Sequence, residues 1–94
     1  MDDGTNYTRV LERVRRLLRE GSIRPSAHAQ KRMAERGFDM NDLQNIIRTG
    51  RIVGHTCPND KWTWKIAGMA VDGDRAACVG AIEGYIVVIT VMAD

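Results

Sequence analysis

The sequence predicts an α+β domain in which three N-terminal helices are followed by a mostly antiparallel four-stranded sheet. Two observations support this prediction. Apolar residues recur at helical spacing before Gly50, whereas they alternate with polar residues after it. Turn signals containing glycine or proline separate the segments. Because the chain has 94 residues, we expect a single domain, 1–94, with one hydrophobic core.

The first predicted helix carries apolar residues at helical spacing, namely Val10, Leu11, Val14, Leu17 and Leu18. Asn6 or Thr8 is available as its N-cap, because both side chains can accept a hydrogen bond from the first turn. The basic residues of this segment fall mainly on the opposite side of the helix. We therefore expect it to pack on the core through its apolar stripe and to expose its arginines.

Two more helices are predicted before the periodicity changes. Pro25 disfavours a helical conformation in the residue before it, and Ser26 is placed to cap a second helix that ends at Gly37. Asp39 is the expected cap of a third helix, which ends at Gly50.

The second half of the chain predicts four strands, at 51–56, 61–68, 75–83 and 85–92. In the second of them Trp62 and Trp64 share one face, and we interpret them as packing residues rather than as platforms for stacking bases. The last strand is apolar on both faces, with Val87, Ile89 and Val91 expected on one of them, as is typical of a central strand. Thr90 is expected to satisfy its hydroxyl inside the protein.

Charge is distributed unevenly along the chain. The net charge of the whole sequence is +2, but residues 5–36 contain nine basic and three acidic residues, a difference of six. Such asymmetry is typical of a surface that binds phosphates or an acidic partner. The alternative is that arginine-rich helices are simply well solvated.

Several classes of protein and site are not expected. No apolar run approaches the ~18 residues of a transmembrane helix, and the N-terminus MDDGTNYTR is too polar for a signal peptide. We therefore expect a cytoplasmic protein with no membrane partner. Cys57 and Cys78 are expected to be free thiols. With His28 and His55 they would suffice for zinc, but the paired spacing of zinc motifs is missing, so we predict no metal and no cofactor.

The second predicted helix carries an unusual polar ridge. At about 100° per residue, His28, Arg32, Glu35 and Arg36 share one face. The helix dipole and the arginines favour a neutral imidazole that can act as a base, whereas Glu35 acts in the opposite direction. The arginines can donate two hydrogen bonds each to a phosphate. The alternative is an ordinary solvated surface, in which His28 hydrogen-bonds a nearby loop and Arg32 pairs with Glu35.

The order of motifs resembles that of a known family. The run S-x-H-A-x-x-R-M-x-E-R-G, followed by D-x-x-x-x-I-x-x-G-x-I, K-x-x-I-x-G and a final I-V-V-I-T-V, is similar to a small bacterial domain family of unassigned function that is grouped with RelE/ParE-type toxins. The resemblance covers residues 26–92 and leaves 5–25 as an N-terminal helix extension.

The resemblance implies a RelE/ParE-like fold and a RelE-like toxin of a toxin–antitoxin module, acting as a metal-independent endoribonuclease on RNA or at the ribosome. Its partner would be an acidic antitoxin protein. The residues expected to be catalytic are His28, Arg32 and Arg36. The residues expected to bind RNA are Lys31, Lys61, Lys65, Arg13 and Arg16.

A non-catalytic module of the same fold is the alternative, either a gyrase-directed ParE-like toxin or a regulator that binds protein or RNA. Similar ribonuclease toxins carry an aromatic or basic residue after the last strand, where this sequence reads T-V-M-A-D. Met92 cannot transfer a proton, and this difference favours the alternative.

Overall fold

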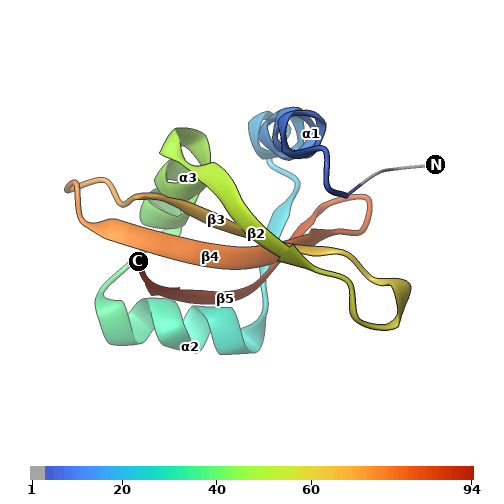
Figure 1. Ribbon diagram of the computed structural model, residues 1–94. Coiled ribbons are helices and arrows are strands. Elements are labelled where there is room, and N and C mark those ends of the chain that lie inside the picture. The colour runs from blue at the N-terminus through green and yellow to red at the C-terminus, as the bar shows by residue number, and fades with distance from the viewer. Residues whose placement is uncertain (1–3) are drawn as a thin grey trace.

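The computed structural model describes residues 4–94 (Figure 1). Its elements are α1 (Tyr7–Arg19), β1 (Ile23–Pro25), α2 (Ala27–Arg36), α3 (Met40–Thr49), β2 (Arg51–Thr56), the 3₁₀ turn η1 (Pro58–Asp60), β3 (Thr63–Met69), β4 (Arg75–Ile82) and β5 (Ile86–Ala93). The interpretation of the N-terminus as too polar for a signal peptide falls partly on residues 1–3, which lie outside the described residues.

The sheet has five strands of mixed orientation in the order β1-β5-β4-β3-β2, so the prediction of a mostly antiparallel four-stranded sheet is wrong. The α+β class itself fits. The additional strand is β1, which pairs in parallel with β5 and places Ile23 opposite Ile86. Three residues are too few to show an alternating pattern, and Pro25 is tolerated there because an edge strand needs a partner on one side only.

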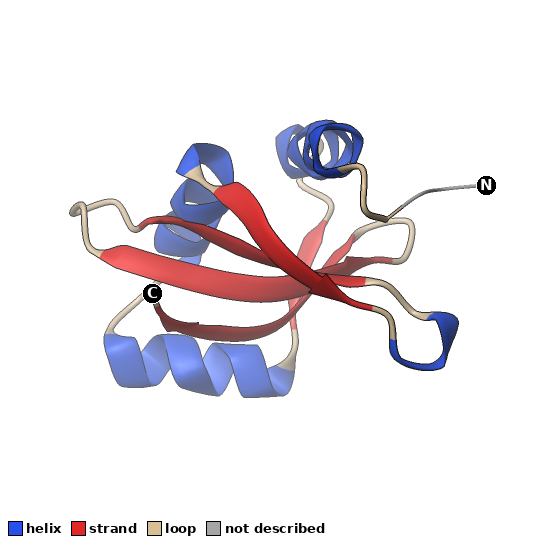
Figure 2. Cartoon of the chain, viewed as in Figure 1, coloured by secondary structure: helices blue, strands red, loops and turns tan. Residues whose placement is uncertain are grey.

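The three helices lie on both sides of this sheet. Figures 1 and 2 show α1 and α3 above the sheet and α2 below it, alongside β5. The core lies between the sheet and the two upper helices. Its largest fully buried side chains are Leu43, Ile46, Ile47, Cys78, Val88 and Val91. α1 and α3 therefore cover one face of the sheet. The opposite face, which we call the open face, is covered only along β5 by α2, through the buried Ala29 and Met33.

The helix α1 is attached to the rest of the fold by its apolar stripe and by one arginine. Val10, Val14 and Leu17 are buried. Of the two candidate caps, Asn6 is the one that caps the helix, by accepting a hydrogen bond from the backbone N–H of Arg9. The guanidinium of Arg15 donates to the carbonyl oxygen of Gly50 at 2.7 Å. This cation lies at the C-terminus of α3, where the helix dipole favours it.

A β-bulge in β5 decides which side chains face the open side. Val79 of β4 is opposite Thr90, but Gly80 is opposite Val88, so Ile89 is an extra residue in β5. Without this bulge Thr90 would share the core-facing side of Val88, because successive side chains alternate. With it, Val91 faces the core, and Thr90 faces the open side. The expectation that Val91 shares a face with Ile89 is therefore wrong.

The start of α3 is fixed by a capping box, as Asp39 predicts. The backbone N–H of Asp42 donates to the Asp39 carboxylate at 3.0 Å, and that of Asp39 donates to the Asp42 carboxylate at 2.9 Å. The N–H of Val71 also donates to Asp42, at 3.0 Å. The backbone hydrogen bonds from Asp39 and Val71 hold the pKa of Asp42 below its ordinary value, because they favour the charged carboxylate.

This shift predicts how the stability of the protein depends on acid. A carboxylate whose pKa is lowered by folding stabilises the folded state above the pKa of the unfolded chain, about 4, and loses that effect as the pH falls through the folded value. We expect Asp42→Ala to lower the melting temperature at pH 7, and the difference from the wild type to narrow below pH ~4. Thermal melts between pH 7 and pH 2.5 measure this difference. Asp94→Ala, which removes the same charge at an exposed position, should show little difference at any pH. If Asp42→Ala lowered the melting temperature equally at low pH and at pH 7, the Asp42 charge would not be the cause.

Candidate functional site

Ser26 fixes the start of α2 and joins it to β5. Its hydroxyl oxygen accepts a hydrogen bond from the backbone N–H of Ala29 at 3.0 Å, as expected for an N-cap, and donates to the carbonyl oxygen of Ile89 at 3.0 Å. Its own N–H donates to Val88 at 2.9 Å, which continues the parallel pairing of β1 with β5. The other end of α2 terminates at Gly37, which has a φ of 69° in the left-handed region that glycine favours. Both ends of α2 are thus defined, and its first turn is held directly beside the β5 bulge.

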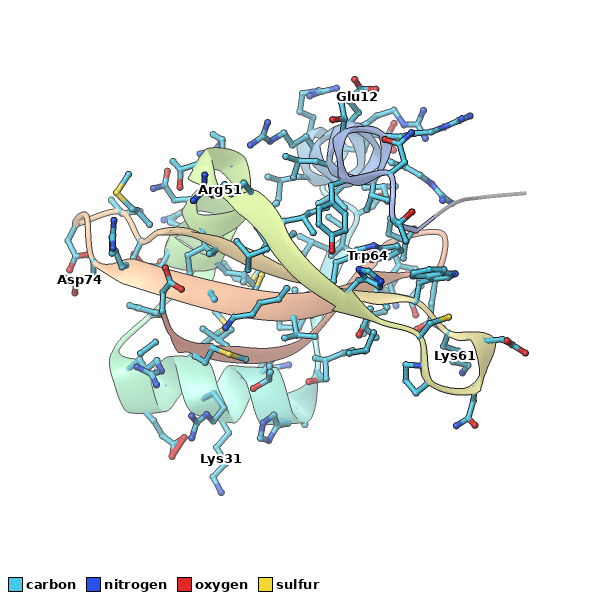
Figure 3. All side chains as sticks on the ribbon, viewed as in Figure 1. Glu12, Lys31, Arg51, Lys61, Trp64 and Asp74 are labelled. Carbon is cyan, nitrogen blue, oxygen red and sulfur yellow. The ribbon has the colours of Figure 1, made fainter. Side chains whose placement is uncertain are left out.

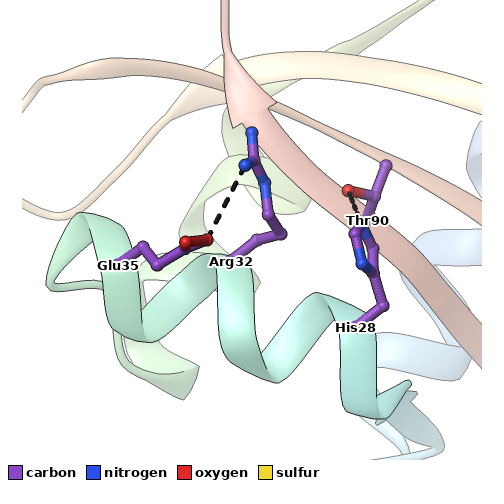
Figure 4. A network of polar contacts seen from close by, with 4 residues as sticks. All are labelled: His28, Arg32, Glu35 and Thr90. Atoms are coloured by element: carbon purple, nitrogen blue, oxygen red, sulfur yellow. Dashed lines mark hydrogen bonds and ion pairs between the residues drawn. The ribbon is translucent and has the colours of Figure 1, made fainter.

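His28 lies in that first turn and contacts the sheet. Its Nε2 is 3.1 Å from Oγ1 of Thr90, the residue that the bulge turns to the open face. Figure 4 shows the imidazole and the threonine facing each other across the gap between α2 and β5. Within residues 4–94, Nδ1 of His28 has no hydrogen-bond partner, and the side chain is exposed. One ring nitrogen is therefore positioned by the protein, and the other is accessible from outside.

Arg32 lies one turn after His28 and points the same way. Figure 4 shows its side chain rising from α2 toward β5, with Glu35 beside it. The Arg32 guanidinium is 3.6 Å from the Glu35 carboxylate, and the two side chains are 40% and 51% exposed. An exposed pair at this spacing is worth only about 0.2–0.5 kcal/mol. The Arg32 guanidinium can therefore leave Glu35 and bind a phosphate with little loss of free energy.

A lysine reaches the same face of the sheet by register. Lys65 of β3 is opposite Val79 of β4, and Val79 is opposite Thr90, so the three residues form one row across the open face. Neighbouring strands are about 4.8 Å apart, so the Cα atoms of Lys65 and Thr90, which lie two strands apart, are separated by about 10 Å. The neighbouring row contains Ala67, Ala77 and Met92, and Ala77 is fully buried. We call His28, Arg32, Lys65 and Thr90 the His28 surface.

The other residues predicted to bind RNA are distributed over the molecule. Figure 3 shows Lys31 pointing away from the sheet on the far side of α2, and Lys61 in the loop that projects beyond β2 and β3. Arg13 and Arg16 belong to α1, on the opposite side of the sheet. Arg36 is exposed in the last turn of α2, within the predicted ridge. The structure thus places His28 and Arg32 one turn apart on α2, with Lys65 two strands away from Thr90 on the same face of the sheet. It places Lys31, Lys61, Arg13 and Arg16 elsewhere.

Thr90 is the residue of this surface that the sequence analysis did not include in the site. Its hydroxyl has an internal partner, as expected, but that partner is His28. The available signal was a single polar residue inside the apolar run I-V-V-I-T-V. Strict alternation would place Thr90 on the same face as Val88, because a bulge leaves no mark in the hydrophobic pattern.

One family model matches most of the chain. Residues 26–93 match the family described as a domain of unknown function (DUF4258). The chain belongs to this family. The DUF4258 region begins at the N-cap of α2 and includes the whole sheet except β1, so that α1 lies outside it. All four residues of the His28 surface lie inside the DUF4258 region. The family description assigns no function and gives no link to RelE/ParE-type toxins. No curated protein and no solved structure matches the chain.

Side chains that could ligate a metal are dispersed in the described part of the DUF4258 protein. Within residues 4–94, no group of three or more His, Cys, Asp or Glu side chains is arranged to hold a metal ion. The two cysteines and two histidines that could have held zinc do not form a cluster, since Cys78 is buried and Cys57 is exposed. In the same part of the chain, no helix is long and apolar enough to cross a bilayer.

The two thiols are expected to differ strongly in reactivity. Burial raises the pKa of Cys78 to about 12, because the thiolate would lose its hydration in the core. Cys57 is exposed in the segment between β2 and η1. We expect Ellman's reagent at pH 8 to label one thiol per folded chain and two in guanidinium chloride. Cys57→Ser should abolish the labelling of the folded protein, and rapid labelling of Cys78 there would show that the core opens readily.

Proposed function

We propose that the His28 surface binds RNA and cleaves it without a metal ion, as a RelE-type endoribonuclease toxin of a toxin–antitoxin module does. One observation carries this proposal. An exposed imidazole is held at 3.1 Å by Thr90, and two cationic side chains share its face of the sheet: Arg32 lies one turn after His28 on α2, and Lys65 lies two strands from Thr90. Cleavage of RNA requires a base and cations around one phosphate.

The chemistry would proceed by attack of the ribose 2′-oxygen on the adjacent phosphorus. When Nε2–H of His28 donates to Thr90, Nδ1 carries a lone pair and takes the proton of the 2′-hydroxyl. The new bond from the 2′-oxygen to phosphorus forms as the bond to the 5′-oxygen breaks. The ammonium of Lys65 donates a proton to the leaving 5′-oxygen, so the products are a 2′,3′-cyclic phosphate and a 5′-hydroxyl. Thr90 acts as a positioning residue.

The arginines of α2 would stabilise the negative charge that develops on the phosphoryl oxygens. A guanidinium can donate two parallel hydrogen bonds to a phosphate, and it remains charged at every physiological pH. Arg32 is close to His28 along the helix, and Arg36 continues the same ridge toward the end of α2. An acidic antitoxin would compete for this cationic surface, and its addition should inhibit both binding and cleavage.

The proposal is tested with one oligoribonucleotide and its 2′-deoxy counterpart, both labelled at the 5′ end. In the presence of EDTA, we expect the RNA to be cut and to carry a 2′,3′-cyclic phosphate, whereas the deoxy strand should be bound but not cut. Both affinities should fall with added salt, by about 0.7 in log K per unit of log salt for each phosphate contact. Cleavage of the deoxy strand would contradict attack by the 2′-oxygen.

A non-catalytic module is the second candidate, and one observation favours it. Within residues 4–94, His28 is the only imidazole on the open face, since Nδ1 of His55 is 2.6 Å from the hydroxyl of Tyr7, on the side of α1. A protein with one imidazole at its site has no second histidine to act as acid. Binding of RNA without cleavage, or growth arrest with intact RNA and damaged DNA in cells that produce the protein, would support this candidate and reject the ribonuclease.

A further inference from the structure

A second site lies on the other side of the sheet from the His28 surface. The N-terminal half of α1 and the region around β3 form a cavity of about 200 Å³. Its apolar walls are Val10, Trp62, Trp64 and Ile82, and its polar side is lined by Arg9 and Arg13. Neither the family match nor the proposed cleavage assigns a role to this cavity.

The aromatic wall of the cavity is held in place by several contacts. The rings of Trp62 and Trp64 are nearly parallel, at 11°, with centroids 6.3 Å apart. Nε1 of Trp64 donates to the carbonyl oxygen of Gly4 at 2.8 Å. The imidazole of His55 lies 5.3 Å from the ring of Trp62 and is itself bonded to the hydroxyl of Tyr7. A ligand would meet a wall that is already ordered, which lowers the entropic cost of binding.

The cationic side of the cavity continues along α1. Arg9 lines the cavity and also a shallow groove on the outer face of the helix, together with Arg16 and Arg19. Arg13 already interacts with another group of the folded chain. We therefore assign the guanidinium of Arg9 to the phosphate of the ligand. Glu12 is the acidic residue of this groove. A phosphate at the mouth of the cavity would therefore meet a guanidinium, with further positive charge along the helix.

Trp64 is buried in the core, as expected of a packing residue, whereas Trp62 is only partly buried. We propose that this cavity binds one unpaired nucleotide, with its base against Trp62 and its phosphate at Arg9. Indole rings combined with guanidinium groups are the chemistry with which proteins bind unpaired bases. The cavity is smaller than the ~300–1,000 Å³ of pockets that take drug-sized ligands, which favours a single planar group. An anionic lipid is disfavoured because the apolar stripe of α1, at Val10, Val14 and Leu17, is already buried.

The nucleotide can be part of an RNA chain or a free mononucleotide. The cavity would recognise the same groups in both, a base and a phosphate. The arginines that follow along α1 favour a chain, because they lie where the next phosphates would pass. This proposal is independent of catalysis at the His28 surface. The His28→Ala protein can therefore be used to measure binding without cleavage of the ligand.

The experiment uses the intrinsic fluorescence of the protein, since its two tryptophans, Trp62 and Trp64, both line the cavity. Full-length His28→Ala protein is titrated with adenosine 5′-monophosphate, and we expect saturable quenching. Arg9→Gln should weaken the affinity about tenfold, the effect of losing one charge-assisted hydrogen bond. Adenosine lacks the phosphate that Arg9 would bind, so it should bind the unaltered cavity about tenfold less tightly than adenosine 5′-monophosphate does. Arg48→Gln, which removes an exposed arginine from the last turn of α3, should leave the affinity unchanged.

Two further measurements complete the test. Trp62→Phe leaves Trp64 as the only tryptophan and should still report binding, which keeps the result independent of the Trp62 signal. A hexa-adenylate chain that binds more tightly than the mononucleotide identifies RNA as the source, and equal affinities identify the free nucleotide. The absence of saturable quenching by either ligand, or an Arg9→Gln affinity equal to that of the parent protein, would overturn the proposal. Saturable quenching in the wild-type protein, together with no cleavage of the labelled RNA by that protein, would reject the proposed ribonuclease alone.

Discussion

Replacing His28 by alanine is expected to lower the rate of RNA cleavage by about 10²–10⁴-fold, which is the usual contribution of a general base. The affinity for RNA should change little, because the cations of Arg32 and Lys65 remain. The melting temperature should also stay close to that of the wild type, since the imidazole is exposed and its one partner, Thr90, is only partly buried. Single-turnover cleavage of a labelled oligoribonucleotide measures the rate, and a gel shift with the deoxy strand measures the affinity.

His55→Ala is the matched control, because it removes the only other histidine of the sequence. That imidazole is hydrogen-bonded to Tyr7 and lies at a tilt beside the ring of Trp62, on the side of the sheet away from the His28 surface. We expect the His55→Ala protein to cleave RNA at a rate within about twofold of the wild-type rate. Cleavage that survives His28→Ala, or that is lost equally in both variants, would remove His28 from the mechanism.

Gly68→Ala is expected to be strongly destabilising. A Cβ at this position would overlap the carbonyl oxygen of Ile46 and lie 2.9 Å from Cα of Gly50. The end of α3 therefore rests directly on the backbone of β3. Overpacking of this kind costs about 1–3 kcal/mol and occasionally more. For a domain of this size each kcal/mol corresponds to about 4–8 °C in melting temperature.

The same region explains why the backbone cannot move away. The hydroxyl of Thr49 donates to Asn45 at 2.7 Å and accepts from the N–H of Met69 at 3.0 Å, so the last turn of α3 is bonded to the residue after Gly68. Gly54→Ala is the control, because a Cβ there meets no atom within 4 Å and the φ is not positive. We expect that variant to be neutral or slightly stabilising. Equal melting temperatures for both variants would show that α3 shifts easily on the sheet.

The two proposed sites lie on opposite sides of the sheet, and this separation has a consequence for RNA binding. The open face carries His28, Arg32 and Lys65, whereas the cavity beneath α1 carries Arg9 and the two tryptophans. The helix α1 precedes the DUF4258 region, so the second site depends on residues that the family match does not cover. Variants of Arg9 and His28 should therefore affect binding and cleavage independently.

The sequence by itself determined the three helices, the caps at Ser26 and Asp39, and the segments of four strands, and it reduced the cap of the first helix to Asn6 or Thr8. These features depend on contacts within a few residues, so their patterns are local. It also predicted the polar ridge of α2, because helical spacing alone places His28 and Arg32 on one face.

The tertiary structure alone decided the fifth strand, the partner of His28 and the separation of the arginines. β1 owes its conformation to β5, more than sixty residues later, and not to its own three residues. The bulge at Ile89 exchanges the two faces of the last strand, and it exists only as a mismatch between paired strands. Arg13 and Arg16 are close in sequence to the ridge of α2, but the chain crosses the sheet between them. Pairing register and the placement of layers arise from contacts between distant segments, which no local pattern contains.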